Sequence, residues 1–255
     1  MKFQSKAVLV TGGATGIGLA AAELFLKEGA SVVIAGRRAI EGEQALAQLR
    51  ILSENVHFVR ADISQLPDVQ QLVQATVERF GRLDIAFNNA GTEGKFGTLE
   101  ELEVGDLDAV INVNLRGTWL CCKYEVAQMK KQGTGGAIVN TSSWLAKGAF
   151  PTSRAYSASK AGLDGMIQAI AAEVAPLGIR VNNVNPGYVV TPMFRRFFDP
   201  ESEAAAAFKK HAPVGRFAQP AEVAELVVWL ASERASFITG QAISVDGGLT
   251  IPGPR

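Results

Sequence analysis

The sequence predicts an α/β fold, a parallel sheet of about seven strands with helices on both faces. Three observations predict it. Short runs of β-branched and apolar residues alternate along the chain with longer helical patterns. These strand runs are continuously apolar, which is typical of strands that are buried on both faces. A glycine-rich segment, residues 11–18, follows the first strand run and opens the first helical pattern. Together they indicate a doubly wound sheet.

The individual elements follow from the same signals. The first strand is predicted at Ala7–Val10, and the helix after it covers about residues 17–28, with Gly29 as its C-cap. The other predicted strands, each rich in β-branched and apolar residues, are 31–35, 56–59, 83–87, 136–140, 180–184 and 242–245. Further helices are predicted near 40–52 and 68–80, and a later one from Tyr156 to about Ala175.

The stretch from Val190 to Gln219 interrupts this alternation. It contains several prolines and a paired aromatic, namely Pro192, Pro200, Pro213, Phe197 and Phe198. We interpret it as a substrate-loop insertion, at about 190–220, that lies over the carboxyl edge of the sheet and includes short helices. No repeat, low-complexity run or linker is visible, so residues 1–255 are expected to form a single domain.

Composition excludes several classes of protein. The 25 basic and 25 acidic residues cancel, which argues against a nucleic-acid binder with a basic surface. The two cysteines, Cys121 and Cys122, are adjacent and supply neither a disulfide framework nor a zinc cage. No apolar run has the length of a membrane span or of a signal-peptide core. We therefore expect a cytoplasmic protein that binds neither nucleic acid nor membrane.

Residues 11–18, with the sequence TGGATGIG, form the first candidate binding element. Glycines at a strand-to-helix turn permit positive φ and let the backbone approach a pyrophosphate, whose charge the helix N-terminus favours. The alternative is a turn that only connects a strand to a helix. Its place at the first βα turn favours nucleotide binding, and with it a Rossmann-type fold. The spacing TGxxxGxG differs from the GxGxxG of the standard fingerprint.

The end of the second strand indicates which nucleotide binds. An NAD site places an acid there to accept a hydrogen bond from the ribose 2′-hydroxyl. This chain has Gly36-Arg37-Arg38 instead, and a guanidinium suits a 2′-phosphate. The alternative is a pair of solvated surface arginines, although the positive end of the following helix disfavours them. We expect NADP(H), with NAD(H) as the alternative.

Tyr156 and Lys160 form the second candidate element. They are four residues apart in a predicted helix, so they share one face. A free tyrosine has a pKa of about 10, and a nearby ammonium lowers that value by favouring the phenolate. Ser143 follows the strand at 136–140, which places its hydroxyl at the carboxyl edge where open α/β sheets bind ligands. A Tyr-x-x-x-Lys pattern alone also occurs by chance.

With these motifs in order, the chain resembles the short-chain dehydrogenase/reductase family, in its compact single-domain branch, from Lys6 to Gly248. The matching motifs are Thr11 to Gly18, Asp62-Ile63, Asn88 to Gly91, Asn114, Ser143, Tyr156 with Lys160, and Pro186-Gly187. The resemblance implies an oxidoreductase that interconverts a ketone or aldehyde and an alcohol by hydride transfer with NAD(P)(H). The alternatives are a 3-oxoacyl-thioester (acyl carrier protein) reductase and a nucleotide-binding regulator without turnover. The intact Ser143, Tyr156 and Lys160 argue against the regulator.

The resemblance also assigns catalytic roles. Tyr156 would exchange a proton with the substrate oxygen, and Lys160 would lower the Tyr156 pKa and bind the nicotinamide ribose. Ser143, which the family spacing selects over Ser142, would hold the substrate oxygen. Asn114 would position a water in a proton relay to Lys160.

The same resemblance completes the cofactor site. Asp62 would accept from the adenine amino group, with Ile63 beside it, although Asp62 as a helix N-cap is the alternative. Residues 89–91 would line the ribose and pyrophosphate path, and Val189 and Thr191 would contact the nicotinamide carboxamide. The full predicted set is Gly12, Thr15, Gly16, Ile17, Gly18, Gly36, Arg37, Arg38, Asp62, Ile63, Asn89, Ala90, Gly91, Tyr156, Lys160, Pro186, Gly187, Val189 and Thr191. His57 and His211 match no motif, so no metal site is predicted.

The substrate side is less determined. Three segments supply candidate lining residues, which are Thr92, Glu93, Trp144, Leu145, Phe150, Tyr188, Met193, Phe194, Phe197 and Phe198. They favour a small hydrophobic ketone or secondary alcohol, as in a carbonyl reductase, or they pack under a lid. Arg195-Arg196 either meets an acidic carrier or lies on the surface. The resemblance implies a homotetramer, and Ala158, Ala161 and Gly165 would allow helices to pack closely.

Overall fold

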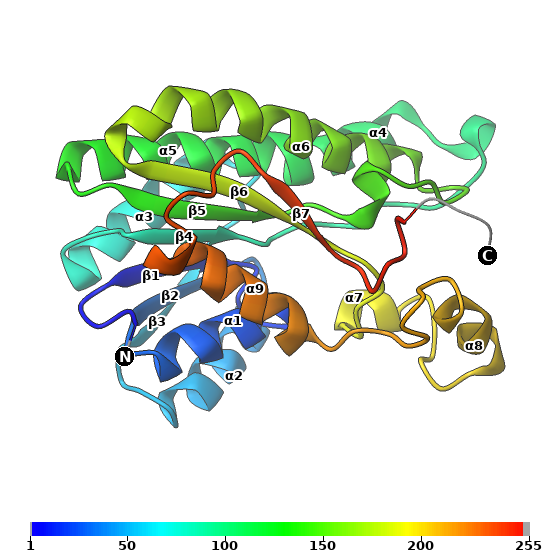
Figure 1. Ribbon diagram of the computed structural model, residues 1–255, viewed down its shortest axis with the longest axis horizontal. Coiled ribbons are helices and arrows are strands. Elements are labelled where there is room, and N and C mark those ends of the chain that lie inside the picture. Colours follow the sequence, from blue (N-terminus) through cyan, green and yellow to red (C-terminus); the bar gives the residue numbers. More distant parts are fainter. Residues whose placement is uncertain (1, 252–255) are drawn as a thin grey trace.

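The computed structural model describes residues 2–251, and its described part contains a seven-stranded parallel sheet (Figure 1). The strands are β1 (Ala7–Thr11), β2 (Ser31–Gly36), β3 (Val56–Arg60), β4 (Ile85–Asn88), β5 (Gly136–Thr141), β6 (Ile179–Pro186) and β7 (Ala242–Val245). Their order in the sheet is β3-β2-β1-β4-β5-β6-β7. This order confirms the predicted doubly wound, Rossmann-type fold.

Helices cover both faces of the sheet, as Figure 1 shows. One face carries α1 (Gly16–Lys27), α2 (Ala39–Arg50) and α9 (Pro220–Ala231). The other carries α3 (Leu66–Phe80), α5 (Thr118–Gln132) and α6 (Arg154–Val174). A further helix, α4 (Val104–Ile111), continues through a π-helical segment at Asn112–Gly117 into α5. Within residues 2–251, no helix combines the length and apolar character that crossing a membrane requires.

The two faces share the strand residues by alternation. Val8 and Val10 of β1 pack with α1, α2 and α9 in one core cluster, whereas Leu9 packs with α3, α5 and α6 in the other. Because successive side chains of a strand point to opposite faces, a strand buried on both faces must be apolar at every position. This is the physical reason that the continuous apolar runs predicted the fold.

Several predicted boundaries were wrong by one or two residues, among them the starts of β4 and α6. β4 begins at Ile85 and not at residue 83, because the Asp84 carboxylate accepts hydrogen bonds from the Ala7 amide and the Arg82 guanidinium. Helix α6 begins at Arg154 and not at Tyr156, since the Ser157 amide already donates to the Ser153 carbonyl at 2.8 Å.

The predicted insertion lies beyond the carboxyl edge of the sheet and contains two short helices, α7 (Pro192–Arg195) and α8 (Glu203–Lys209). The direction of chain progression across the sheet reverses between β1 and β4. Ligands of open α/β sheets bind in the crevice at such a reversal, outside the carboxyl ends of the strands. The glycine-rich turn after β1 and residues 89–91 after β4 both lie there.

Candidate active site

A single elongated pocket joins most of the predicted site residues. It follows the carboxyl edge from the glycine-rich turn, past the ends of β4 and β5, to α6 and α7. Gly18 and Asn114 are the two predicted site residues that do not line it. Those that do are Gly12, Thr15, Gly16, Ile17, Gly36, Arg37, Arg38, Asp62, Ile63, Asn89, Ala90, Gly91, Ser143, Tyr156, Lys160, Pro186, Gly187, Val189 and Thr191.

The glycine-rich turn needs glycine for conformation and for space. Gly12 and Gly16 have φ of 64° and 58°, a region that L-residues with side chains rarely adopt. A Cβ on Gly12 would lie 2.9 Å from the Ala90 Cα, and one on Gly18 would overlap the Gly12 carbonyl oxygen. Gly18 thus lets α1 pack against the turn and does not line the pocket. The first turn of α1 carries no acidic residue, so its N-terminus is open to an anion.

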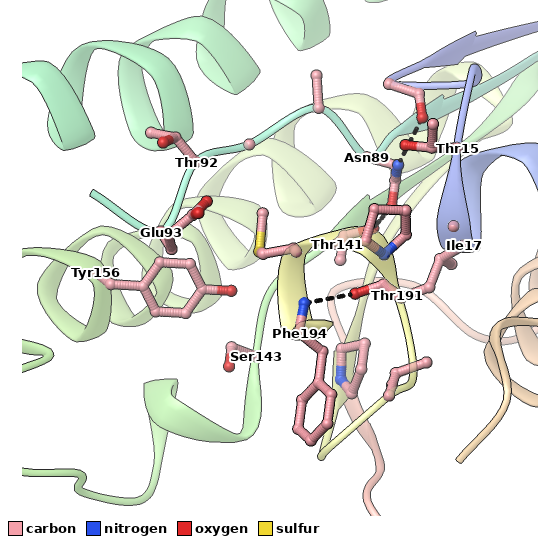
Figure 2. Close-up of a pocket in the computed structure, with 18 of the residues that line it drawn as sticks. Thr15, Ile17, Asn89, Thr92, Glu93, Thr141, Ser143, Tyr156, Thr191 and Phe194 are labelled. Atoms are coloured by element: carbon pink, nitrogen blue, oxygen red, sulfur yellow. Dashed lines mark hydrogen bonds between the residues drawn. The ribbon is translucent and has the colours of Figure 1, made fainter. Parts of the chain in front are cut away.

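Asn89 ties the ends of three strands together. Its Nδ2 donates to the Gly12 carbonyl at 3.1 Å, and its Oδ1 accepts from the Thr141 hydroxyl at 3.1 Å. The Thr11 hydroxyl accepts from the amides of Asn89 and Ala90. These bonds fix the backbone of residues 89–91 beside the glycine-rich turn (Figure 2). Thr11 belongs to the predicted segment 11–18, whereas sequence reasoning missed the contact of Thr141, the last residue of β5.

The far end of the pocket carries the two arginines. Arg37 lies 3.9 Å from the Asp62 carboxylate and Arg38 lies 2.9 Å from Glu41, and both guanidinium side chains are more than half exposed. Asp62 is not a helix N-cap, since Gln65 has that position in α3. Its Oδ1 instead accepts from the Ser64 amide and hydroxyl. This end of the pocket therefore has a basic rim formed by Arg37 and Arg38, with the Asp62 carboxylate behind it.

Lys160 and Tyr156 project from one face of α6, as predicted. The Lys160 ammonium lies over the Tyr156 ring, 5.5 Å from its centroid, and donates to the Thr141 carbonyl at 2.7 Å. Lys160 is buried, and burial lowers its pKa to about 8, while the charge of Asp164 raises it. The ammonium therefore titrates near the physiological range.

The Tyr156 pKa departs from the expectation that a nearby ammonium lowers it. Burial raises the pKa of Tyr156 to about 12, the hydrogen bond with Ser143 lowers it, and the Glu93 charge raises it. The reason is that desolvation and a nearby carboxylate both disfavour the phenolate. In Figure 2 the ring points into the pocket between Glu93 and Ser143. The phenol is thus held in its protonated, proton-donating form.

The two serines after β5 have different orientations. The Ser142 hydroxyl donates to the Lys160 carbonyl at 3.1 Å and so is committed to α6. The Ser143 hydroxyl accepts from the Leu145 amide at 3.1 Å and caps the short 3₁₀ turn Trp144–Ala146. The Ser143 hydroxyl lines the pocket and makes the hydrogen bond with Tyr156 that lowers the Tyr156 pKa.

Asn114 lies behind the pocket wall, in the π-helical segment between α4 and α5. It is fully buried, exchanges hydrogen bonds with the backbone of Thr92, and donates to the Ser159 hydroxyl. A Cβ on Gly91 would lie 3.2 Å from the Asn114 Oδ1 and 3.7 Å from the Lys160 Nζ. Asn114 is therefore close to Lys160 but separated from the pocket by Gly91 and Thr92. Such π-helical segments are frequent at functional sites.

Aromatic side chains form the substrate end of the pocket. Tyr188 is central, with Trp144 and Phe208 in edge-to-face contact at centroid distances of 5.4 Å and 5.8 Å. Apart from Tyr156, the aromatic residues that line the pocket, called the aromatic wall below, are Phe96, Trp144, Phe150, Tyr188, Phe194, Phe197, Phe198 and Phe208. Sequence reasoning missed Phe96 and Phe208, although both lie in segments that supplied other candidate lining residues.

Two contacts join the loop after β4 to the segment containing α7. Arg196 donates two hydrogen bonds to the Glu93 carboxylate, at 2.7 Å and 3.0 Å, and Phe96 stacks edge-to-face on Phe197 at 4.8 Å. Thr191 begins α7, and its hydroxyl accepts from the Phe194 amide at 3.1 Å. Arg196 is therefore bound within the protein, which removes it from the arginine pair suggested for an acidic carrier.

The last two sequence predictions concern the cysteines and metal binding. Cys121 and Cys122 are buried in the core clusters around α5, as expected of packing residues, and burial raises the pKa of both thiols. Among residues 2–251, no three His, Cys, Asp or Glu side chains come together as metal ligands.

A Rossmann-type sheet with a glycine-rich turn, and with a serine, a tyrosine and a lysine gathered at its carboxyl edge, defines a dinucleotide-dependent oxidoreductase. Residues 12–250 match the model of a family described as Enoyl-(Acyl carrier protein) reductase. The chain belongs to this family, within the short-chain dehydrogenases/reductases. The predicted resemblance is confirmed.

Known relatives are similar over nearly their full length. The A-factor type gamma-butyrolactone 1′-reductase (1S-forming) of Streptomyces virginiae is 39% identical over 95% of this chain and 95% of that protein. The 2,5-dichloro-2,5-cyclohexadiene-1,4-diol dehydrogenase of Sphingobium indicum is 38% identical over 97% of this chain and 98% of that protein. The crystal structure of 3-ketoacyl-(acyl-carrier-protein) reductase from Brucella melitensis complexed with NADH has a TM-score of 0.90 at 34% identity. It covers 98% of this chain and 100% of that one. The chain is an NAD(P)(H)-dependent oxidoreductase of carbonyl and alcohol groups.

Proposed function

We propose that the protein interconverts a ketone and a secondary alcohol carried on an apolar ring, with NADP(H) as the favoured cofactor. The observation that carries this proposal is that Tyr156 and Ser143 meet the aromatic wall in one pocket, whose other end is the glycine-rich turn. The proton-exchanging groups and an apolar surface thus face the same space.

The shape of the glycine-rich turn fits the pyrophosphate of a dinucleotide. Gly12 and Gly16 line the pocket beside the N-terminus of α1, so no side chain stands between their backbone and the space where a pyrophosphate would bind. When bound, NAD(P)H supplies the hydride that reduces the carbonyl carbon. In that direction the Tyr156 hydroxyl donates its proton to the carbonyl oxygen, and the Ser143 hydroxyl donates a hydrogen bond to the same atom. The Lys160 ammonium stabilises the phenolate that remains, and Asn114 supports the backbone around it.

The preference for NADP(H) rests on charge. Gly36 ends β2 where an NAD site has an acid, and Arg37 and Arg38 follow with exposed guanidinium groups. A 2′-phosphate would be met there by two cations and by no carboxylate from the strand end. The Arg37–Asp62 contact of 3.9 Å is loose enough for a phosphate to compete.

A cofactor titration tests this preference. NADPH and NADH are titrated separately against the wild type, Arg37→Ala and Arg38→Ala, with nicotinamide fluorescence as the signal. We expect each substitution to weaken NADPH binding roughly 10-fold, the worth of one charge-assisted phosphate contact, with little change for NADH. Arg50→Ala, at the other end of α2, is the matched control. Equal affinity of the wild type for NADPH and NADH would refute the preference.

The ring substrate rests on the aromatic wall and on the relatives. The names of the Streptomyces and Sphingobium proteins both contain a ring compound. Flat apolar rings pack well against edge-to-face aromatic side chains, which the contacts of Tyr188 with Trp144 and Phe208 provide.

A second candidate is the 3-oxoacyl-thioester reductase. The similarity to the Brucella melitensis enzyme favours it, whereas the pairing of Arg196 with Glu93 removes a cation that a carrier would use. A much higher kcat/KM for an acetoacetyl thioester than for cyclohexanone would select this candidate.

We also propose a homotetramer, on the resemblance stated above and on exposed apolar surface. A shallow groove between α5 and α6 is lined by Ile111, Leu115, Trp119, Gly162 and Met166, among others. Trp119 is 45% exposed there. The cytoplasmic location, the single-domain boundary and the absence of nucleic-acid binding stay predictions.

A further inference from the structure

Asp164 lies on the face of α6 that carries Tyr156 and Lys160. The three residues follow one another at intervals of four, so they form one row along the helix. Its carboxylate accepts hydrogen bonds from two amides of β6, Asn183 Nδ2 at 2.8 Å and Asn185 Nδ2 at 2.7 Å. These amides are two residues apart and so share one face of the strand. One carboxylate therefore holds the carboxyl half of β6 against α6.

Asn185 carries this contact on to the catalytic serine. The same Nδ2 donates to the Ser143 carbonyl at 3.1 Å, and the Ala146 amide donates to that oxygen at 3.0 Å. Asn185 is fully buried, and its Oδ1 has no hydrogen-bond partner in the described chain. Only the two acceptors on Nδ2 thus fix the orientation of the amide. Without the Asp164 carboxylate, one of the two is lost.

Asp164 is also the charged end of a row of amides across the sheet. Asn88 donates to Asn140, Asn140 donates to Asn183, and Asn183 donates to Asp164, at 2.8 to 3.0 Å. All three asparagines are buried. Hydrogen bonds that run in one direction toward a carboxylate strengthen one another in a low-dielectric interior. The Asp164 carboxylate is therefore the final acceptor of this row.

We propose that Asp164 is a positioning residue, which acts through Asn185 on the Ser143 carbonyl and so fixes the Ser143 hydroxyl beside Tyr156. This inference rests on the proposed function, because it supposes that Ser143 binds the substrate oxygen. Asp164 has a second effect within the same row of α6, since its charge favours the Lys160 ammonium. Tyr156 on α6 and Glu93 from the loop after β4 are the other titratable groups around this part of the site.

The test compares three substitutions. Asp164→Asn removes the charge and weakens the support of Asn185, whereas Asn185→Ala removes the contact with Ser143 and keeps the charge. Asn183→Ala is the matched control, because it deletes an equally buried amide from the same carboxylate and does not touch Ser143. Each variant is measured for ketone reduction, for NADPH affinity, for thermal stability and for hydrogen exchange of the Leu145 and Ala146 amides.

We expect Asp164→Asn and Asn185→Ala to lower kcat roughly 10- to 100-fold, the usual effect of a small misplacement of a reacting group, with NADPH affinity unchanged. The Leu145 and Ala146 amides, which hold Ser143, should exchange faster in both. Asn183→Ala should keep kcat within about twofold, whatever it costs in stability. The alkaline limb of the kcat profile should move to lower pH in Asp164→Asn alone, because loss of a nearby anion lowers the pKa of an ammonium.

Two results would overturn the positioning role of Asp164. These are equal losses of kcat in Asn183→Ala and Asn185→Ala, and unchanged exchange of Leu145 and Ala146 in Asp164→Asn. An unmoved alkaline limb in Asp164→Asn would overturn its second effect, on the Lys160 ammonium. A wild type that reduces no ketone contradicts the proposed function instead. The exchange comparison then decides the positioning of Ser143 alone, since it needs no turnover.

Discussion

The carboxyl of Glu125 lies inside the protein, on α5 and against β4. Asn88 Nδ2 donates to its Oε2 at 2.9 Å, while Glu125 Oε1 and Asn88 Oδ1 have no hydrogen-bond partner in the described chain. A protonated carboxyl would add a hydroxyl donor to this site, which holds two buried acceptors without a donor. Burial raises the pKa of Glu125 to about 8, and the Asn88 hydrogen bond lowers it. Burial thus favours the protonated, neutral form of Glu125 in the folded protein.

This burial predicts a pH dependence of stability. Between the ordinary pKa of 4.5 and the folded value of about 8, the folded chain binds a proton that the unfolded chain does not. The free energy of unfolding therefore falls as pH rises through this window. Glu125→Gln stays neutral, so above about pH 8 it should be more stable than the wild type by roughly 2–4 kcal/mol, with little difference at acidic pH.

Urea unfolding at an acidic and an alkaline pH measures this difference. Glu43→Gln, at an exposed position of α2, is the control and should show no pH-dependent gain. If Glu125→Gln and the wild type lost stability in parallel on the alkaline side, Glu125 would be ionised in the folded protein.

For single residues, the sequence predicts well which side chains line the site, but it predicts their pKa values poorly. Ser143, Tyr156 and Lys160 were all located from motif spacing, and the structure gathers them in one pocket. The predicted direction of the Tyr156 pKa shift was wrong. Burial and the Glu93 charge raise this pKa, and both effects come from residues that only the fold brings close to Tyr156. Asp164 and Asn185 belong to no motif, and only their three-dimensional contact with Ser143 reveals them.

Helix α8 contributes one side chain to the aromatic wall. Phe208 stacks on Phe198 at 4.5 Å and on Tyr188 at 5.8 Å, and its neighbours in α8 are mostly alanine. Phe208→Ala should raise KM for a ring ketone roughly 10-fold, the worth of a lost apolar contact in a pocket, and leave NADPH affinity unchanged. Steady-state kinetics with cyclohexanone measure this. Phe237→Ala, at a fully exposed side chain, is the control.

An unchanged KM in Phe208→Ala would mean that the aromatic wall only packs beneath the insertion. That was the alternative left open by the sequence. Elements of the sheet were predictable because each strand must be apolar on both faces. The positions of α7 and α8 in the insertion were not predictable. Both helices are short, and contacts such as Glu93–Arg196, which join distant segments, fix the insertion in place.

The assembly of the whole molecule can be tested at α6, because the proposed tetramer would pack this helix against a second copy. A Cβ on Gly165 would meet no atom within 4 Å, so the single chain has room for a side chain there. If α6 packs closely against a second copy, that copy fills the space beside Gly165. Gly165→Leu should therefore reduce the wild-type assembly to smaller species without unfolding the chain.

Light scattering after size exclusion measures the mass of both proteins. Ile40→Glu, on α2 at the opposite face, is the control and should keep the wild-type mass. An unchanged mass in Gly165→Leu would place the contacts between copies elsewhere.

We propose that the protein reduces a ring ketone with NADPH and that Tyr156 supplies the proton. The most direct measurement is the rate of NADPH oxidation with cyclohexanone by the wild type and by Tyr156→Phe, after fluorescence has shown that both bind NADPH. We expect turnover by the wild type and a loss of at least about 100-fold in Tyr156→Phe. Similar rates for the two proteins would contradict the role of Tyr156, and no turnover by the wild type on any ring ketone would contradict the proposed substrate.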